Sequence, residues 1–461
     1  MKRKLSICIY GGLICLLASC NNYLDVEPKG KIIPEKAEDY ATIIHYWLDQ
    51  IEKGTDDVIV PNPEKTGQLE LFAEDLDATL ATGYSTSYLY AGTSINNNQG
   101  LYEELYSVIK DCNIVIGDMD DKESELAKKL LGTAWAIRSI CYYNLMQRYC
   151  EAYSPATAAQ TLGLPLVDQF DMEAKPERST LQETARFIDE GFKTALSYHL
   201  SDEDFLFTEN VVKAYMARFY FWIQDWGNAS EMAKEALEFY PMLEADEYAN
   251  AINQKIRKTH NVIMRSFVED DDLGNMSYAG AQADMRMRPV SRNMVELFNS
   301  SSNDVRRTVA FDAKRIVGKV VTTKFRSEEL CLIIAESCAH SNDETGALKY
   351  LNLLRGKRIT EGYVPYTSST LPKVYEQRIT VDATGAPLTK LMSAILCERR
   401  MELFLEGDRW FELKRNGCPE FWIAANGKKY VNEKYLYTFP LPKNDIELFP
   451  GLLIQNPGYI E

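Results

Sequence analysis

The chain of 461 residues lacks the short motifs on which nucleotide and zinc chemistry depend. No two glycines are separated by a single residue, so the dinucleotide-binding pattern G-x-G-x-x-G is absent. No Gly-Lys pair is followed by Ser or Thr, as a phosphate-binding loop requires. No two cysteines form C-x-x-C, and the four histidines occur neither as H-E-x-x-H nor as H-x-H. The sequence therefore predicts a protein that uses no cofactor and holds no zinc.

An excess of positive charge is also missing. The chain has 51 Lys and Arg against 67 Asp and Glu, which gives a net charge of -16 at pH 7. A protein that binds nucleic acid or an anionic membrane surface through charge needs a basic stripe. We therefore expect neither as a partner through charge.

Motifs for hydrolysis are absent as well. The segment from Gly83 to Ser87 fails the pattern G-x-S-x-G at its last position. The acidic run at residues 269–272 lacks the alternating spacing of a calcium loop. Paired carboxylates, which glycosidases use, can be chosen almost anywhere among so many acidic residues. No catalytic residue and no metal ligand is therefore assigned.

The N-terminus carries a processing signal. Lys2, Arg3 and Lys4 precede an apolar run at residues 5–18 that is too short to span a bilayer, and small residues then lead to Cys20. This order resembles a bacterial lipoprotein signal, with residues 1–19 removed and lipid attached to Cys20. Loss of three positive charges with the signal gives residues 20–461 a net charge of -19. We therefore expect the lipid to provide the anchoring.

Seven cysteines remain after the signal and the lipidated residue. Most stand in apolar helical patterns, as Cys141 and Cys338 do, where cysteine acts as a small buried hydrophobe. We expect few or no disulfides.

Apolar residues recur every three or four positions in several stretches, which predicts an all-α protein. One such stripe is Leu130, Ala134, Ile137, Cys141 and Leu145. The helices are expected to form pairs similar to tetratricopeptide repeats, at about residues 102–149, 181–240 and 325–355. In the second of these, a turn at 224–228 precedes a helix whose contact face carries Ala229, Ala233 and Ala236.

Two capping boxes are expected to begin helices. Thr180 with Glu183 is predicted to start one, and Ser341 with Glu344 another. Between the helical stretches, residues 62–100, 270–289 and 356–385 show neither helical nor strand periodicity. Loops of this length are usually functional or disordered, so the first two are predicted to bear a ligand site.

Residues 398–415, ERRMELFLEGDRWFELKR, combine ten charged side chains with aromatic residues. Acids and bases stand three apart, which predicts helical ion pairs between Arg399 and Glu402, Glu406 and Arg409, and Glu412 and Arg415. An apolar anchor is expected from Leu403, Phe404, Trp410 and Phe411, with a bend or close backbone contact at Gly407. A self-neutralising set of this kind, exposed or partly exposed, predicts scaffold rather than a catalytic site.

The same stretch resembles the C-terminal signature of the SusD/RagB family of outer-membrane lipoproteins, with Glu412 in place of the usual Asp. The matching positions are Glu398, Arg399, Arg400, Glu402, Glu406, Gly407, Arg409 and Trp410. Further matches follow the family's order along the chain: Cys20 with Tyr23, Leu24, Asp25 and Pro28; Asn113; Arg138, Tyr142 and Tyr143; Asp304 and Arg306; Glu336; and an ending with Pro440, Pro442, Asn456, Pro457, Gly458 and Tyr459.

The resemblance implies a helical protein whose long loops form a ligand face. It also implies a lipid anchor in the outer leaflet of the outer membrane, exposed on the surface of a Gram-negative cell. Its partner would be a SusC-like TonB-dependent transporter, to which the protein delivers captured glycans without cleaving them. Some branches of the family capture peptides, and no residue here excludes that alternative.

Sugar capture needs aromatic faces flanked by amides and carboxylates. Residues 83–100 offer Tyr84, Tyr88 and Tyr90 together with Asn97, and Tyr278 is a candidate in the second loop. Tyr88 and Tyr90 would share one face of an extended segment. Two further hypotheses stay open at this point: a lipid-anchored glycosidase, and a helical-repeat scaffold that binds a partner protein and no small ligand.

Overall fold

The computed structural model describes residues 36–55, 58–81, 100–171, 173, 175, 177–254, 259–266, 272–321, 324–425 and 428–459. This part of the chain is mostly helical, as the sequence predicts. Its helices are α2 (Ala37–Lys53), α3 (Pro63–Phe72), η1 (Ala78–Leu80), α5 (Gly100–Asp118), α6 (Glu125–Tyr149), α7 (Leu181–Leu196), η3 (Glu203–Phe205), α8 (Glu209–Trp222), α9 (Trp226–Phe239), α10 (Ala245–Ala251), α11 (Asp272–Arg286), α12 (Arg292–Phe298), α13 (Val305–Ala310), α14 (Ser327–His340), α15 (Glu344–Gly356), α16 (Lys390–Glu402), α17 (Arg409–Arg415), η4 (Lys434–Tyr437) and α18 (Lys443–Leu448).

The strands form three antiparallel two-stranded sheets within the described residues. They pair β1 (Leu162–Pro165) with β2 (Arg178–Thr180), β3 (Val262–Arg265) with β4 (Lys324–Arg326), and β5 (Phe421–Ala425) with β6 (Lys428–Asn432). The β3–β4 pair joins the segment just before α14 to residues 262–265, far earlier in the chain. The small sheets therefore connect helices and build no layer of their own.

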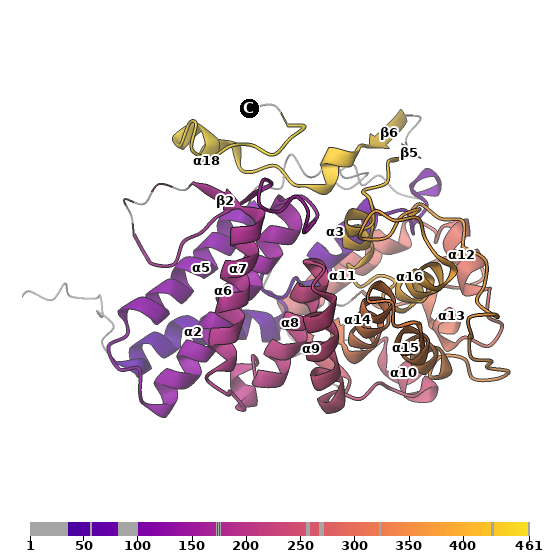
Figure 1. The fold of residues 1–461 in the computed structure, drawn as a ribbon, viewed down its shortest axis with the longest axis horizontal. Coiled ribbons are helices and arrows are strands. Elements are labelled where there is room, and N and C mark those ends of the chain that lie inside the picture. The colour runs from indigo at the N-terminus through magenta and orange to yellow at the C-terminus, as the bar shows by residue number, and fades with distance from the viewer. Residues whose placement is uncertain are drawn as a thin grey trace, which may run out of the picture.

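The central helices stack in a row that runs across Figure 1. Helix α5 packs on α6, α6 on α7 and α7 on α8, then α8 on α9, α9 on α14 and α14 on α15. Residues 102–149 and 325–355 contain the helix pairs α5/α6 and α14/α15, whereas residues 181–240, expected to form one pair, contain α7 as well as the pair α8/α9. These helices continue one another as repeats do. The alanines of α9 lie fully buried against its neighbours, because small side chains let helices approach closely.

Two of the pairs are closed by the same turn. A residue with positive φ, Gln224 in one pair and Asn342 in the other, is followed by an aspartate that caps the next helix. Asp225 accepts a hydrogen bond from the Asn228 amide, and Asp343 accepts one from the Gly346 amide at 2.8 Å. This recurrence supports the repeat interpretation beyond helix packing alone.

The shared turn corrects two predictions. Ser341 ends α14 and does not cap α15, because the chain reverses at Asn342 and places Asp343 at the N-cap. The turn between α8 and α9 is also shorter than 224–228, since α9 begins at Trp226. The capping box of Thr180 and Glu183 is confirmed at the start of α7.

Of the three segments predicted to be irregular, two contain a helix and one does not. Helix α3 lies inside residues 62–100, and α11 occupies most of residues 270–289, so both predictions of loop structure were wrong there. Helix α3 is buried on almost every side and therefore has no amphipathic period to recognise. Residues 357–385 contain no named helix or strand, as predicted.

One large apolar core lies along the helix row, with α6 and α14 buried nearly all round. A smaller core joins α11 and α12 to residues 401–405. All seven described cysteines are free thiols, and five of them are buried. No helix in the described ranges combines the length and apolar content needed to cross a bilayer.

Candidate functional site

Most of the charged residues in 398–415 lie in the interior of the protein. Glu402, at the end of α16, accepts hydrogen bonds from three buried arginines: Arg326 at 2.7 Å, Arg358 at 3.0 and 3.1 Å, and Arg306 at 3.4 Å. The Glu402 carbonyl accepts a further bond from Arg326 at 2.8 Å. One carboxylate thus joins β4, the segment that follows α15, and α13.

This cluster extends to further ion pairs and is formally neutral. Its cations are Arg306, Arg326, Arg355, Arg358 and Lys319, and its carboxylates are Asp304, Glu328, Glu398, Glu402 and Glu406. Nine of these residues are buried, and the side chain of the tenth, Glu406, is only 4% exposed. Charges withdrawn from water in this way are stable only when each has a close partner, so the geometry is strongly constrained.

Burial and the contacts between opposite charges determine the pKa values of the groups in this cluster. Burial opposes ionisation of Glu402, but Arg358, Arg326 and Arg306 outweigh it and hold the pKa of this carboxyl well below its usual value. Burial likewise opposes the charged form of Arg326, while Glu406 and Glu402 raise its pKa well above the ordinary range. These groups remain charged over the whole physiological pH range.

The predicted ion pairs of residues 398–415 were wrong in their partners. Arg399 pairs with Asp408 at 2.9 Å, Glu406 with Lys319 and Arg326, and Arg415 with Glu336. The break between α16 and α17, with positive φ at Leu405 and Gly407, separates Glu406 from Arg409. The other two predicted pairs each lie within one helix, but Glu402 and Arg415 meet ion-pair partners on other segments. The scaffold interpretation is supported, but through buried pairs with distant segments rather than exposed pairs along one helix.

Remaining members of the signature attach this region to the segment after α3. Arg400 donates to Asp75 at 2.8 Å, and Arg409 pairs with Glu74 and Glu412. Trp410 is buried, stacks on Tyr437 with a 4.5 Å centroid distance and meets Phe72 edge to face. The predicted apolar anchor is therefore present.

Gly407 makes the close backbone contact expected of it. Its φ is 81°, and its N–H donates to Glu70 Oε1 at 2.6 Å. A Cβ atom at this position would lie 3.3 Å from Thr66 Cγ2. Burial, with the neighbouring charge of Asp75, raises the pKa of Glu70 to about 8.

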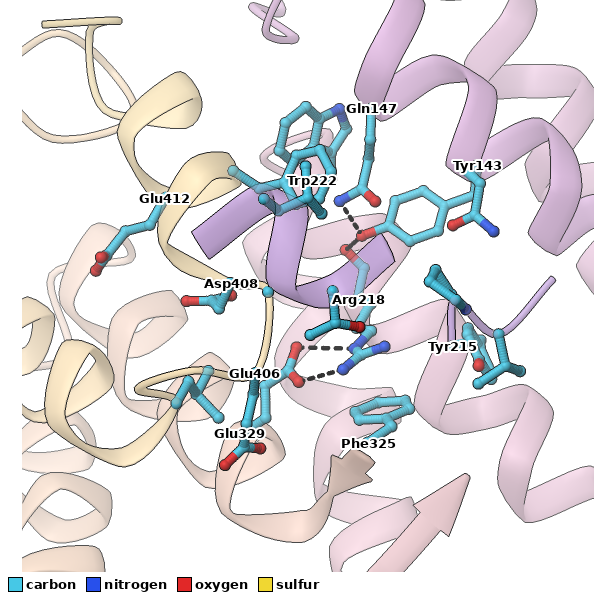
Figure 2. A pocket seen from close by; sticks show the side chains of 18 of the residues that line it. Tyr143, Gln147, Tyr215, Arg218, Trp222, Phe325, Glu329, Glu406, Asp408 and Glu412 are labelled. Atoms are coloured by element: carbon cyan, nitrogen blue, oxygen red, sulfur yellow. Dashed lines mark hydrogen bonds and ion pairs between the residues drawn. The ribbon is translucent and has the colours of Figure 1, made fainter. Parts of the chain in front are cut away.

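A cavity adjoins this scaffold between α6, α8, α14 and α16, and Figure 2 shows its wall. Arg218 and Glu329 form an ion pair across it, and Tyr143 accepts a hydrogen bond from Gln147 at 2.8 Å. The cavity volume of about 130 Å³ is below the ~300 Å³ of small-molecule sites. Its carboxylates Glu329, Glu406 and Asp408 are engaged by arginine or lysine, so they stabilise the fold rather than offer a free acid or base.

Most of the predicted ligand residues lie outside the described part of the chain. These are Tyr84, Tyr88, Tyr90 and Asn97, and the same holds for Cys20. Tyr278 is described, and it lies half-buried on α11, which packs on α3, rather than in a loop. Burial raises the pKa of its hydroxyl, partly offset by Arg286.

Residues 82–99 lie outside the described part of the chain, between η1 and α5 in the sequence. On one side η1 packs against β5. On the other, the first turn of α5 lies near α18: burial raises the pKa of Asp445, and the charge of Glu103 adds to that effect. Figure 1 shows β5, β6 and α18 along one edge of the molecule.

Trp422 is an exposed aromatic residue on this edge that was not among the predicted ligand residues. It stands opposite Val431 across the β5–β6 hairpin, and the two side chains are 55% and 43% exposed. The neighbouring Phe421 is buried, because successive side chains of a strand point to opposite faces. Lys429 Nζ lies 5.1 Å from the centroid of the Trp422 ring. The Asn426-Gly427 dipeptide between two β-type runs was a hairpin signal in the sequence.

The fold and the interior charge network define a helical-repeat protein. The charged residues of its C-terminal signature hold helices and loops together in the interior. Comparison with known families then places it: the SusD family model matches residues 217–459, and a model described as "Starch-binding associating with outer membrane" matches residues 22–221. The chain belongs to the SusD family.

Solved structures show the same fold over nearly the whole chain. A SusD superfamily protein from Bacteroides thetaiotaomicron VPI-5482 is 19% identical, with a TM-score of 0.70, covering 92% of this chain and 100% of its own. A SusD-like carbohydrate binding protein from Bacteroides vulgatus ATCC 8482 is 17% identical, with a TM-score of 0.65 and coverages of 91% and 98%. A laminarin binding SusD-like protein is 14% identical, with a TM-score of 0.59 and coverages of 92% and 100%. A search of curated protein sequences gives no significant match.

Proposed function

We propose that this protein is a cell-surface lipoprotein that captures glycans and delivers them to a SusC-like TonB-dependent transporter of the outer membrane. The observation that carries the proposal is membership of the SusD family, with family models covering residues 22–221 and 217–459. Similar folds include carbohydrate-binding and laminarin-binding proteins. In this proposal residues 1–19 are the signal, Cys20 bears the lipid, and residues 20–461 form one SusD-like unit.

The edge formed by β5, β6 and η1 supplies the surface for capture. Sugars bind where an aromatic ring meets their C–H faces and polar groups meet their hydroxyls. Trp422 presents an exposed indole there, with the amino group of Lys429 beside it. Tyr84, Tyr88, Tyr90 and Asn97 belong to the segment that starts from η1, so they are proposed to act with Trp422.

Capture without cleavage is proposed because the interior carboxylates serve other partners. Glycoside hydrolysis needs one acid and one base or nucleophile flanking the scissile bond. Glu329, Glu406 and Asp408 are each paired with a buried cation beside a cavity too small for a sugar chain. The proposed role is therefore binding and hand-over.

The test is calorimetric titration of the protein from residue 21 onward with laminarin, starch, xylan, pectin, mucin glycans and a peptide digest. Chromatography of each mixture follows any products. Saturable binding to one glycan without new products is the expected result. Binding only to peptides, or release of sugar products, would overturn the proposal.

Trp422→Ala, Tyr88→Ala and Tyr90→Ala locate the site, and stacking energies predict about a tenfold loss of affinity for each residue in contact. Phe239→Ala is the matched control, because Phe239 is similarly exposed at 57% but ends α9, which lies below the hairpin edge in Figure 1. Equal effects of Trp422→Ala and Phe239→Ala would remove the hairpin edge from the site.

A further inference from the structure

A groove lies beside the segment that leads into η1. It runs between the start of α12 and residues 373–378, has a volume of about 700 Å³, and includes Glu74 in its lining. That volume falls within the range of ligand sites, about 300 to 1,000 Å³. Leu76 bridges to Val290, and the Asp77 amide donates to the Pro289 carbonyl at 2.8 Å. The groove therefore adjoins the segment that leads into η1.

Hydrogen bonds hold residues 373–378, one wall of the groove, against the start of α12. Asn293 donates to the Glu376 carbonyl at 3.1 Å and accepts from Arg400 at 2.8 Å, while Tyr375 donates to the Asn293 carbonyl at 2.8 Å. Arg400 belongs to the buried scaffold and pairs with Asp75. Residues 373–378 are therefore held in place although they belong to no helix or strand, which favours a preformed site.

In this wall, the side-chain amide of Gln377 makes no hydrogen bond to the described residues. Both polar atoms of its side chain are shielded from solvent and have no hydrogen-bond partner among the described residues. An unpaired buried amide costs stability unless something else satisfies it. Turning this amide toward a ligand in the groove would break no hydrogen bond of the protein.

The walls favour a ligand that is neutral and rich in hydroxyl groups. Exposed Glu296 and Glu376 offer acceptors, and exposed Lys373 and Arg378 offer donors, so neither sign of charge dominates. Val374 adds an exposed apolar side chain. Mixed donors and acceptors around an apolar patch match the alternating hydroxyl and C–H surfaces of a sugar chain.

We propose that this groove is a second glycan subsite, which holds part of a chain whose other part lies at the β5–β6 and η1 edge. The protein would therefore select polymeric glycans over mono- and disaccharides. This inference rests on the proposed function and adds the length of the ligand to it.

The test uses whichever polysaccharide of the panel binds, cut by partial acid hydrolysis into oligosaccharides of two to twelve units. Affinity is expected to rise with length in the wild-type protein. In Gln377→Leu and in Glu296→Gln, affinity for the longest oligosaccharides should fall about fivefold to tenfold, while that for the shortest is unchanged. Glu231→Gln, an exposed carboxylate of α9, is the matched control for charge removal.

Thermal unfolding separates a binding role from a structural one. Gln377→Leu should leave the Tm unchanged or raise it, because its amide has no partner to lose. Gln455→Leu should lower the Tm, since the Gln455 amide bonds both the N–H and the carbonyl of Leu441. A lower Tm in Gln377→Leu would overturn the proposal.

The remaining outcomes separate this inference from the proposed function. An unchanged length dependence in both groove variants would refute the groove and leave glycan capture standing. Failure of every glycan in the panel to bind would remove the proposed function and this inference with it.

Discussion

Arg358 donates two parallel hydrogen bonds to Glu402, from Nε to Oε2 at 3.0 Å and from Nη2 to Oε1 at 3.1 Å. Both side chains are fully buried. Arg326 and Arg306 approach the same carboxylate. Paired forks of this kind fix orientation as well as distance. The SusD signature therefore acts in this chain as an internal brace.

Loss of the Glu402 charge should be strongly destabilising. Glu402→Gln leaves three buried arginines with too little negative charge, and we expect the free energy of unfolding to fall by about 3 to 5 kcal/mol. Urea unfolding followed by circular dichroism measures the change. The matched control is Glu447→Gln, which removes an exposed pair with Lys443 and should change stability by less than about 0.5 kcal/mol. Similar losses in the two variants would contradict the brace.

Acid should weaken the protein through carboxylates such as Glu336. Burial opposes its ionisation, but Arg415 and His340 together outweigh burial, and the pKa of the carboxyl falls to about 2 from an ordinary 4.5. The native state binds this proton less readily than the unfolded chain, so the contribution is complete above pH 4.5 and is lost as pH falls toward 2. The gap in unfolding free energy between wild type and Glu336→Gln should therefore narrow between pH 6 and pH 3. A constant gap over that range would contradict the lowered pKa of Glu336.

Glu70 should change the free energy of unfolding with pH in the opposite direction. Burial raises the pKa of this carboxyl to about 8, so the native state holds a proton that the unfolded chain releases near pH 4.5. Stability from this group declines as pH rises from 4.5 to 8. Glu70→Gln keeps an acceptor for the Gly407 amide without the charge. We expect it to match wild type at pH 4 and to exceed it at pH 9 by on the order of 3 kcal/mol, since one pKa unit is about 1.4 kcal/mol.

Gly407 can be tested against a glycine that has room around it. Gly407→Ala combines a left-handed backbone with a Cβ placed 3.3 Å from Thr66 Cγ2, whereas Gly362 has positive φ and no neighbouring atom within 4 Å. The backbone term alone costs about 1 to 2 kcal/mol. Gly407→Ala should therefore lower the free energy of unfolding by about 1 kcal/mol more than Gly362→Ala. An equal cost would show that Thr66 moves aside freely.

The proposed anchor depends on one residue, Cys20. Wild-type protein expressed in a Gram-negative host should incorporate radiolabelled palmitate and sediment with outer membranes. Cys20→Ala should do neither, because no other lipid attachment site is proposed. Labelling of the variant would place the anchor elsewhere, and resistance of the wild type to protease added to intact cells would argue against surface exposure.

Several features of the fold could be predicted from residue patterns because their causes are local. The stripe through Leu130 and Leu145 predicted α6, and Thr180 with Glu183 predicted the start of α7. The signature of residues 398–415 predicted the family, and its mixture of charge and aromatic residues predicted scaffold. Helices α3 and α11 were missed, since burial on most faces or interrupting glycines remove the periodic pattern.

The sequence by itself determined the helical class, the family and the structural character of the charged signature, because spacing and composition express local geometry. Only the tertiary structure decided which charges meet. Glu402 pairs with Arg326 and Arg358 rather than with Arg399 of its own helix, because distant segments pack against the end of α16. Likewise, the exposure of Trp422 and the unpaired amide of Gln377 follow from how distant segments pack, which no local pattern records.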